Sequence, residues 1–366
     1  MKNKKIKVAM ITNDMNINGI STVVMNYCQH LNKSDFDVTI IAGNPINEFY
    51  IKECEQYGIS LVRMPARREN PICFYLSLFK QLRKNRYDIV HVHGNSAMIT
   101  PELLLAWLCG IKHRIAHSHN STCDNIKAHK ILLPLFDTLY TDGFACSILA
   151  GEWLFRNKKF TVIHNGFEVE KFRFDEEKRK NLREKYGLED SFVIGNVARF
   201  NNQKNHPFLL KVFESIAKQN NKAKLVLLGT GPNLESVKKE ISCSEFKDRI
   251  LYLGETSTVN DYYNMMDVFV LPSKHEGLGI VFVEAQINGL PVITSDQVPR
   301  EVDIGQVANF LSLDASVEEW AEAILRVKPV NRTEFYVKNS NKINLYNIKN
   351  NVLTLERYYK AMVEIK

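Results

Sequence analysis

The stretch "DVFVLPSKHEGLGIVFVEAQINGLPVITSD", residues 267–296, predicts a strand, a loop, a helix and a second strand in succession. The runs "DVFVLPS" (267–273) and "PVITSD" (291–296) are apolar on consecutive residues, which is typical of strands buried on both faces of a sheet. Between them, "IVFVEAQINGLP" is predicted to form a helix that ends near Gly289. Because a helical connection of this kind joins parallel strands, the stretch indicates an α/β fold.

The same alternation of short β-rich runs and helical stretches extends over the whole chain. The 366 residues exceed what one hydrophobic core usually spans, so two domains are expected. The charged stretch 168–190 is interpreted as a linker plus one helix, which places the boundary after residue 167. Each half is predicted to be a doubly wound parallel sheet. The other predicted strands are 7–12, 37–43, 87–94, 113–119, 143–147, 160–166, 192–199, 224–231 and 249–255.

Composition is that of a globular protein, with 45% hydrophobic and 24% charged residues and no apolar run near the roughly 20 residues of a membrane span. The lysine-rich opening "MKNKKIKVAMIT" is expected to lead into a first strand rather than to be a signal peptide. Asn13 and Asp14 interrupt its apolar run, whereas a signal peptide needs a continuous one. Seven scattered cysteines without a C-x-x-C pair favour reduced thiols and a cytoplasmic protein, and disfavour a disulfide framework or a structural zinc site.

The net charge of +7 lies entirely in the first half of the chain. Residues 1–160 hold 20 basic and 13 acidic residues, whereas the remainder holds 28 of each. A basic half suggests an anionic partner such as lipid headgroups, phosphates or nucleic acid, although a solvated basic surface explains the excess equally well. The stretch "CFYLSLFKQLRKNR" (73–86) is either a helix lying on a membrane surface or a crossover helix packed on the sheet.

The loop and helix entry inside the opening stretch have the composition of a ligand site. Glu276 lies in the loop after a strand, and the backbone amides at the helix entry are able to bind phosphate oxygens. Glu284 follows about two turns later and, unless it is simply an exposed helix acid, can accept hydrogen bonds from a pair of hydroxyl groups such as a ribose diol. The helix-entry residues are Gly277, Leu278, Gly279 and Ile280.

Three further segments follow predicted strands and are candidates for phosphate contacts. In "ARFNNQKN" (198–205), Arg199 and Lys204 are two cations suited to a diphosphate, unless they are ordinary loop residues. In "NDMNINGISTVVMNY" (13–27), Gly19 is expected in a loop before a helix, where it either approaches a ligand or makes a plain turn. In "LLGTGPN" the glycine turn is interpreted as structural.

Histidines alternate on two consecutive predicted strands. His91 and His93 lie on the first, and His117 and His119 on the next. Such a set could hold a metal ion, but no matching carboxylate or cysteine cluster accompanies it. We favour a role for one histidine as a polar group at the ligand site, and expect no metal.

Together these pieces resemble the retaining glycosyltransferases of family 4, which have the GT-B fold, and among them the bacterial enzymes of capsule and exopolysaccharide synthesis. The resemblance covers nearly the whole chain. Its most specific part is the pair of glutamates in "LPSKHEGLGIVFVEAQINGLPVITSD", followed by "VARFNNQKNH". The segments "HVHG", "RIAHSHNST" and "VIHNGFEVEKF" match the usual first-domain and hinge segments. The loop "NGIS" departs from the family, where a double glycine followed by an acid is common.

The resemblance implies the role of each residue. Arg199 and Lys204 would hold the donor diphosphate, Glu276 the donor sugar and Glu284 the ribose. The amides from Gly277 to Ile280 would line the sugar and phosphates, Gly19 would lie beside the phosphates, and His119 would face the reacting sugar. The fold would comprise two Rossmann-like domains facing across a cleft, the acceptor-side domain at 1–167 and the nucleotide-sugar domain at 168–347. A C-terminal helix at about 348–366 would cross back to the first domain.

The resemblance also implies the reaction and its partners. A hexose would move, with retention and without a metal or other cofactor, from a nucleotide sugar to a saccharide or lipid-linked saccharide. The expected nucleotide is UDP, with GDP as the alternative. The basic first half would suit peripheral contact with the inner face of the cell membrane, and nucleic acid is not expected. The competing hypotheses are a non-catalytic sugar-nucleotide-binding subunit, a GT-B nucleotide-sugar epimerase, a retaining glycosidase and a metal hydrolase.

Overall fold

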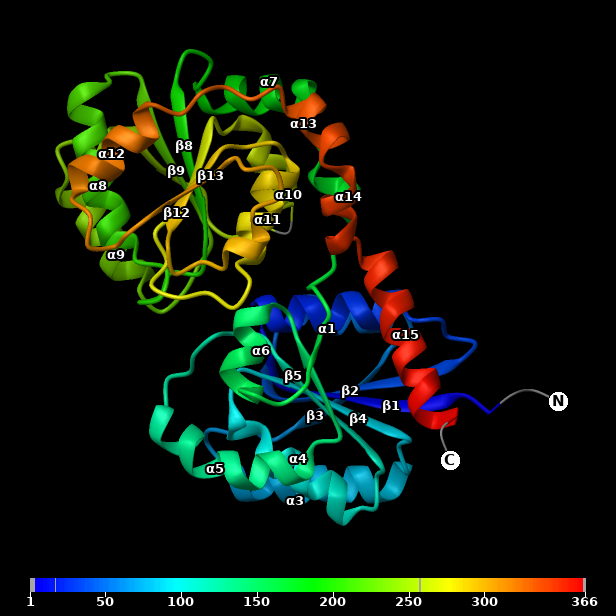
Figure 1. Ribbon diagram of the computed structural model, residues 1–366. Helices are drawn as coiled ribbons and strands as arrows, with labels where there is room; N and C mark the ends of the chain where they lie inside the picture. The colour runs from blue at the N-terminus through cyan, green and yellow to red at the C-terminus, as the bar shows by residue number, and fades with distance from the viewer. Residues whose placement is uncertain (1–3, 17, 257, 365–366) are drawn as a thin grey trace. The chain divides into compact units, whose positions relative to one another are not determined.

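The structure, a computed structural model, describes residues 4–16, 18–256 and 258–364 (Figure 1). The chain divides into two compact units. The first unit comprises Met1–Phe167 with Leu345–Lys366, and the second comprises Glu168–Asn344. Residues 345–347 were predicted in the second domain but belong to the first unit, because backbone hydrogen bonds of 2.9 and 3.0 Å join Phe167 to Tyr346 and Ile348.

The first unit is built on a seven-stranded parallel sheet. Its strand order is β3-β2-β1-β4-β5-β6-β7, in which the direction of winding reverses between β1 and β4. Ligands of open α/β sheets bind beyond the carboxyl ends of the strands at such a reversal. The strands are β1 (Ile6–Met15), β2 (Phe36–Ile46), β3 (Ser60–Met64), β4 (Ile89–Gly94), β5 (His113–Ser118), β6 (Asp142–Ala145) and β7 (Thr161–Val162).

Helices cover both faces of this sheet. Helices α3, α4 and α5 lie along one face, and α1 lies along the other, where it contacts α15 (Figure 1). The C-terminal helix α15 is thus an integral part of the first unit. The helices of this unit are α1 (Gly19–His30), α2 (Glu48–Gln56), α3 (Pro71–Asn85), α4 (Thr100–Leu108), α5 (Ile126–Leu139), α6 (Ile148–Phe155) and α15 (Ile348–Glu364).

The second unit repeats the same topology on six parallel strands. The order β10-β9-β8-β11-β12-β13 again reverses its winding, here between β8 and β11. The strands are β8 (Phe192–Val197), β9 (Ala223–Leu228), β10 (Ile250–Tyr252), β11 (Val268–Leu271), β12 (Val292–Ser295) and β13 (Ala308–Leu311). The helices are α7 (Glu176–Tyr186), α8 (His206–Gln219), α9 (Leu234–Cys243), α10 (Val259–Tyr262), α11 (Ile280–Ile287), α12 (Val317–Leu325), α13 (Arg332–Lys338) and α14 (Ser340–Ile343).

Helix α12 closes one side of the second core. Its Trp320 is fully buried, packs edge-on against Phe208 of α8, and donates from its indole nitrogen to the Ser312 carbonyl at 2.9 Å. A capping box is present at its start, because Ser316 and Glu319 exchange hydrogen bonds between side chain and backbone. Such a box satisfies amides that the first helical turn leaves without partners.

Several elements had no counterpart among the predicted strands and helices, including helices α5 and α8, strands β3 and β13, and helix α2. Strand β3 and strand β13 are edge strands with mostly half-buried residues, so neither carries a continuous apolar run. Helix α2 is only nine residues long, with two of them buried. Residues 365–366 of the predicted last helix lie outside the described residues.

Among the described residues, no helix combines the length and apolar character needed to cross a bilayer.

Candidate functional site

Two loops of the second unit meet at the carboxyl ends of adjacent strands. The loop after β8 carries Arg199 and Lys204, and the loop after β11 carries Glu276. Gln203 joins the two loops: its backbone carbonyl accepts from the Lys274 amide at 2.8 Å, and its side-chain Nε2 donates to the His275 carbonyl at 2.8 Å. Parallel pairing of β8 with β11 therefore brings together residues that the sequence separates by more than 70 positions.

Lys204 and Glu276 form an ion pair inside this junction. Lys204 Nζ lies 2.5 Å from Glu276 Oε1, and the side chains are 14% and 6% exposed. Nε2 of Gln203 lies 3.4 Å from the other carboxylate oxygen. The predicted phosphate cation and the predicted sugar-binding acid are thus one hydrogen-bonded unit.

Arg199 lies at the same edge but in a different environment. Its side chain is exposed, and no hydrogen bond or ion pair holds it among the described residues. The loop that carries it runs against the glycine turn after β9, where a Cβ on Gly231 would come within 2.4 Å of the Phe200 carbonyl oxygen. The turn in "LLGTGPN" therefore has the structural role that was predicted for it, because it permits two backbones to pass at close range.

The N-terminus of α11 opens on the same loop as Glu276. Gly279 occupies its N-cap in the left-handed region, with φ of 73°, and no side chain caps the helix. The first amides of a helix lack intrahelical partners. An uncapped helix start with its positive dipole end is suited to an anion. A side chain at Gly279 would be strained in this conformation.

Glu284 is buried rather than an exposed helix acid. It is 9% exposed, and its Oε2 accepts a hydrogen bond from the Tyr263 hydroxyl at 2.8 Å. Burial raises the pKa of Glu284 to about 7, and the hydrogen bond from Tyr263 opposes this rise. The free oxygen of such a carboxyl can still accept hydrogen bonds from hydroxyl groups.

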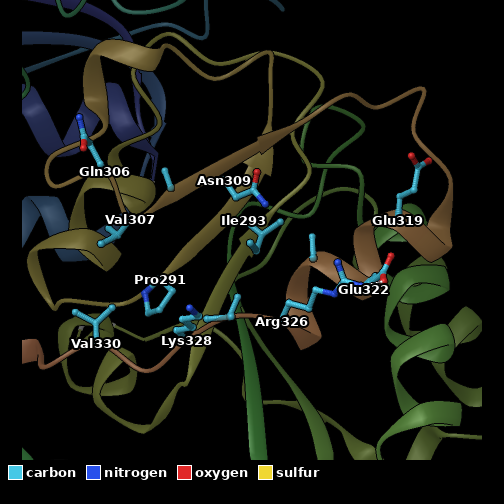
Figure 2. A pocket seen from close by; sticks show the side chains of 13 residues that line it. Pro291, Ile293, Gln306, Val307, Asn309, Glu319, Glu322, Arg326, Lys328 and Val330 are labelled. Carbon is cyan, nitrogen blue, oxygen red and sulfur yellow. Dashed lines mark ion pairs between the residues drawn. The ribbon is translucent and has the colours of Figure 1, made fainter.

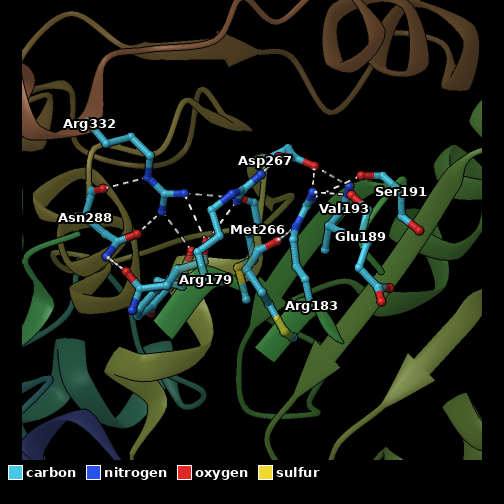
Figure 3. Close-up of polar contacts among 12 residues, drawn as sticks. Arg179, Arg183, Glu189, Ser191, Val193, Met266, Asp267, Asn288 and Arg332 are labelled. Atoms are coloured by element: carbon cyan, nitrogen blue, oxygen red, sulfur yellow. Dashed lines mark hydrogen bonds and ion pairs between the residues drawn. The ribbon is translucent and has the colours of Figure 1, made fainter. Parts of the chain in front are cut away.

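Arg332 contacts Asn288 and Met266 (Figure 3). Its guanidinium donates to the backbone carbonyls of Tyr263 at 2.8 Å and of Asn288, just beyond the end of α11, at 2.9 Å. Burial lowers the pKa of Arg332 to about 9. Beside it, Arg179 and Arg183 of α7 each bind Asp267 at 2.5 Å. This network lies at the amino ends of the strands, at the opposite edge of the sheet from the loops that carry Lys204 and Glu276.

Two hollows of the second unit lie away from these loops. One of about 580 Å³ lies between β12, β13 and α12, with Ile293, Asn309 and Arg326 in its wall (Figure 2). Another of about 680 Å³ adjoins the Arg179–Arg332 network. None of the predicted donor-binding residues lines either hollow, so neither is assigned to the candidate site.

Four histidines of the first unit, His91, His93, His117 and His119, form a buried array on β4 and at the end of β5. His91 Nε2 lies 3.1 Å from His117 Nδ1, and His93 Nδ1 lies 2.9 Å from His119 Nε2. Burial lowers the pKa of all four rings, that of His119 to about 3, so they are neutral. A metal ion at the cluster of His91, His93 and His117 would have to displace these ring-to-ring hydrogen bonds.

His119 ends this array at the carboxyl end of β5. It is 9% exposed. Asn165, 4% exposed, lies beside the ring, and a side-chain hydrogen bond between Asn165 and His119 opposes the lowering of the His119 pKa by burial. His119 is thus the histidine of the array that follows the carboxyl end of β5.

Gly19 is the one predicted site residue whose local structure was misjudged. It is the first residue of α1 rather than part of a loop. Asn18 is the N-cap and accepts from the Ser21 amide at 3.0 Å, while Asp14 accepts from the Asn18 side chain at 3.1 Å. The asparagine supplies a cap, and this lets the helix begin earlier than the apolar pattern indicates.

The sequence analysis did not single out Gln203, Tyr263 or Asn165. Gln203 lies inside a quoted segment, but its bond to the neighbouring loop is a tertiary contact. Tyr263 lies in the segment before β11, where no motif singled it out. Only the pairing of the strands reveals these residues.

Comparisons with known proteins agree with this architecture. Residues 17–171 match the family model described as Glycosyltransferase Family 4, and residues 178–344 match that described as Glycosyl transferases group 1. The chain is 30% identical to the Bacillus subtilis glycosyltransferase EpsF, covering 100% of this chain and 99% of the relative. It is 27% identical to the Escherichia coli UDP-Gal:alpha-D-GlcNAc-diphosphoundecaprenol alpha-1,3-galactosyltransferase, covering 98% of each.

Solved structures show the same fold. Anabaena HepE in complex with UDP and glucose superposes with a TM-score of 0.80 at 15% identity, covering 97% of this chain and 99% of that one. Staphylococcus aureus TarM, in complex with fondaparinux, alpha-GlcNAc-glycerol and UDP, gives a TM-score of 0.74 at 12% identity, covering 96% and 99%. With two Rossmann-like units, two matching family models and a relative at 30% identity over its full length, this chain belongs to family 4 of the glycosyltransferases and has the GT-B fold.

Proposed function

We propose that this protein transfers a sugar from a nucleotide-diphosphate donor, expected to be a UDP-sugar, to a saccharide or lipid-linked saccharide in surface polysaccharide synthesis. The observation that carries the proposal is the buried Lys204–Glu276 pair beside the uncapped start of α11. The names of the relatives support both the donor and the kind of product, since one is a UDP-Gal-dependent galactosyltransferase and another a Staphylococcus aureus capsular polysaccharide glycosyltransferase.

In this proposal, positive groups at the loop junction receive the diphosphate. The exposed Arg199 forks onto phosphate oxygens, Lys204 adds a point charge, and the α11 amides complete the site. Negative charge grows on the leaving oxygen as the glycosidic bond breaks. Groups fixed in advance around that charge are often the largest contribution to catalysis. No metal ion is then required.

The two glutamates hold hydroxyl groups of the donor. Glu276 keeps one oxygen on Lys204 and accepts from the donor sugar, which links sugar recognition to phosphate recognition through one ion pair. Glu284 accepts from the ribose diol while Tyr263 occupies its other oxygen. His119 in the first unit contributes a polar group to the reacting sugar.

Retention of configuration is proposed through front-face attack. The sugar passes through an oxocarbenium-like state, and the departing phosphate accepts the proton of the attacking acceptor hydroxyl. No enzyme nucleophile is needed, which is consistent with two glutamates that serve binding roles. A determination of the anomeric configuration of the product tests this part separately.

The outer surface of α3, α4 and α5 supports a membrane-bound acceptor. Most exposed side chains of these helices are apolar or basic, and the acids on them are the buried Glu102 and the paired Asp137. On α3, the inner stripe of Phe74, Leu78 and Leu82 is buried, as a crossover helix packed on the sheet requires, and the opposite face is exposed. The exposed apolar and basic residues include Ile72, Leu76, Lys80, Arg83 and Lys84 on α3, Trp107 and Leu108 on α4, and Lys127, Lys130, Ile131 and Leu135 on α5.

Apolar side chains flanked by lysine and arginine are typical of proteins that lie on anionic lipid surfaces. We therefore propose that this surface, the α3–α4–α5 surface, contacts the membrane that carries the acceptor. It would place the protein at the inner face of the cell membrane.

A panel of nucleotide sugars tests the donor function. Each donor is measured for its effect on the melting temperature and for slow hydrolysis without acceptor, with and without EDTA. We expect one UDP-sugar to raise the melting temperature and to be hydrolysed equally in EDTA. Conversion of the donor to another nucleotide sugar would indicate an epimerase, donor binding without turnover a non-catalytic subunit, and no response to any donor would overturn the proposal.

A further inference from the structure

Arg332, the first residue of α13, joins two segments of the second unit that lie far from it in the sequence. Its Nη2 donates to the backbone carbonyl of Tyr263 at 2.8 Å, and its Nε donates to the backbone carbonyl of Asn288 at 2.9 Å. Nη2 also binds the side chain of Asn288 (Figure 3). Tyr263 begins the 3-10 turn before β11, and Asn288 is the C-cap of α11. One guanidinium group therefore fixes the spacing between that turn and the end of α11.

The same two segments carry the two partners of a buried hydrogen bond. The Tyr263 hydroxyl donates to Glu284 Oε2 at 2.8 Å, and the Val281 carbonyl is a more distant acceptor at 3.4 Å. Burial raises the pKa of Tyr263 well above its usual value, so the hydroxyl keeps its proton and acts as the donor. Glu284 is 9% exposed, and among the described residues no other hydrogen bond reaches its side chain.

The position of the Tyr263 hydroxyl follows the position of the Tyr263 backbone. The side chain is fully buried, and its ring packs against those of Phe172 and Phe269 at centroid distances of 6.1 and 5.8 Å. A tyrosine ring is rigid, so movement of the turn relative to α11 would carry the hydroxyl away from Glu284. Hydrogen bonds weaken steeply when such alignment is lost. Arg332 therefore acts on Glu284 through Tyr263.

Gly289 lets Arg332 approach the end of α11 closely. Its φ of 77° lies in the left-handed region, and a Cβ there would come within 2.8 Å of Arg332 Cα. Glycine has no Cβ and adopts this conformation readily. Any larger residue would have to push the end of α11 and Arg332 apart.

We propose that Arg332 and Tyr263 are positioning residues for ribose recognition. Arg332 holds Tyr263 against Glu284, and Tyr263 occupies one carboxylate oxygen so that the other accepts from the ribose hydroxyls of the nucleotide. The inference rests on the proposed function for the identity of the ligand as a ribonucleotide. The alternative is that Arg332 only stabilises the fold, by binding carbonyls at the end of a helix as basic side chains often do.

Calorimetry with UDP and 2′-deoxy-UDP separates these two roles. We expect the wild type to prefer UDP by about tenfold, as loss of a hydrogen bond to a charged group implies. Arg332→Lys keeps the charge but loses the fork that bridges two carbonyls, and it should reduce the preference to about twofold. Arg249→Lys is the matched control and should retain the preference, because Arg249 binds the Ala217 carbonyl near the end of α8 at 3.1 Å. A full preference in Arg332→Lys would overturn the inference.

A second pair of variants tests whether Arg332 acts through Tyr263. Tyr263→Phe should itself reduce the preference for UDP, and adding Arg332→Lys should reduce it no further. An additional reduction in the double variant would contradict the inference, and so would a full preference in Tyr263→Phe. If Arg332→Lys does not fold, Gly289→Ala replaces it in both comparisons, because it separates the same two segments and keeps the arginine.

A measurement without nucleotide follows the same contact. Burial already raises the pKa of Glu284, so the folded protein loses stability as pH rises, and loss of the Tyr263 hydrogen bond should enlarge that loss. Unfolding free energies at about pH 5 and about pH 8 should show the enlarged loss in Tyr263→Phe and in Gly289→Ala. Gly187→Ala, at φ of 64° with no atom within 4 Å of an added Cβ, should show the wild-type loss. A wild-type loss in Gly289→Ala would contradict the inference.

The two measurements distinguish failure of this inference from failure of the proposed function. Wild-type protein that binds no UDP, or that binds UDP and 2′-deoxy-UDP equally, would contradict the proposed function. If Gly289→Ala and Tyr263→Phe still enlarge the pH-dependent loss of stability, the positioning of Glu284 would stand. A preference for UDP that survives Arg332→Lys would contradict this inference alone.

Discussion

Lys204 Nζ lies 2.5 Å from Glu276 Oε1, across two loops that neighbouring strands bring together. Both side chains are largely buried, so each charge depends on the other for compensation. A diphosphate arriving beside this pair would share the lysine, and a sugar hydroxyl would share the carboxylate. Binding and catalysis by these residues are therefore expected to be coupled.

Lys204→Ala and Arg199→Ala are each expected to lower kcat by about 10²-fold or more, as loss of a preorganised donor to an oxyanion does. The measurement is initial transfer rate at saturating donor. Lys211→Ala removes an exposed lysine from the outer side of α8 and should leave kcat unchanged. Wild-type rates in both site variants would exclude the phosphate role.

The free energy of unfolding should change differently when one partner of the Lys204–Glu276 ion pair is replaced and when both are replaced. Lys204→Ala leaves a buried carboxylate without its partner, and such a loss costs about 3–5 kcal/mol. Adding Glu276→Gln should recover part of that free energy, because the remaining amide carries no charge. Urea unfolding of the single and double variants measures the coupling, and strictly additive effects would contradict it.

Glu284 should make stability depend on pH. Its pKa rises from an ordinary 4.5 to about 7 on folding, so between these values the folded protein keeps a proton that the unfolded chain has released. The retained proton therefore stabilises the folded protein fully below the unfolded pKa. This stabilisation, about 3 kcal/mol in total, is lost as pH rises through the folded pKa.

Glu284→Gln should abolish that slope, whereas Glu318→Gln, at an exposed position on α12, should retain it. Unfolding free energies at about pH 5 and about pH 8 are compared for the three proteins. Equal slopes in the wild type and Glu284→Gln would show that another group is responsible. UDP affinity should rise over the same interval, because the ionised carboxylate is the better acceptor for ribose hydroxyls.

Gly279→Ala should weaken donor binding as well as the fold. A side chain at φ of 73° costs about 1–2 kcal/mol and would shift the first amides of α11. Gly187→Ala is the matched control, because Gly187 has φ of 64° at the C-cap of α7 and a Cβ there meets nothing within 4 Å. Both variants should lose similar stability, and only Gly279→Ala should lose UDP affinity in calorimetry.

The α3–α4–α5 surface should bind anionic vesicles. Wild-type protein is expected to co-sediment with phosphatidylglycerol vesicles and to be released by salt, and not to bind pure phosphatidylcholine. Leu76→Glu with Ile131→Glu should abolish binding, because both side chains are exposed, at 57% and 76%.

Leu353→Glu, at a position 51% exposed on α15, is the control and should bind as the wild type does. Binding by the double variant would contradict the proposal. Failure of wild-type protein to bind would also contradict it, and a dimer dispersed by the double variant would instead assign this surface to a second copy of the chain.

The sequence by itself determined most of the regular elements and the chemistry of the candidate site. Continuous apolar runs predict strands buried on both faces, and the acids, cations and glycines that follow them predict a nucleotide-sugar site. This information is local, because a buried strand needs apolar residues at every position. Edge strands such as β3 and β13 carry no such run and were missed.

Only the tertiary structure decided which polar groups meet and in what environment. Parallel pairing of β8 with β11 joins Lys204 to Glu276, and burial raises the pKa of Glu284 although the hydrogen bond from Tyr263 opposes this rise. Likewise, the neighbouring strands β1, β4 and β5 bring Met10, His93 and His119 into one chain of contacts. Pairing partners and burial are long-range properties, and they set the charge and acidity of residues whose identity the sequence alone supplies.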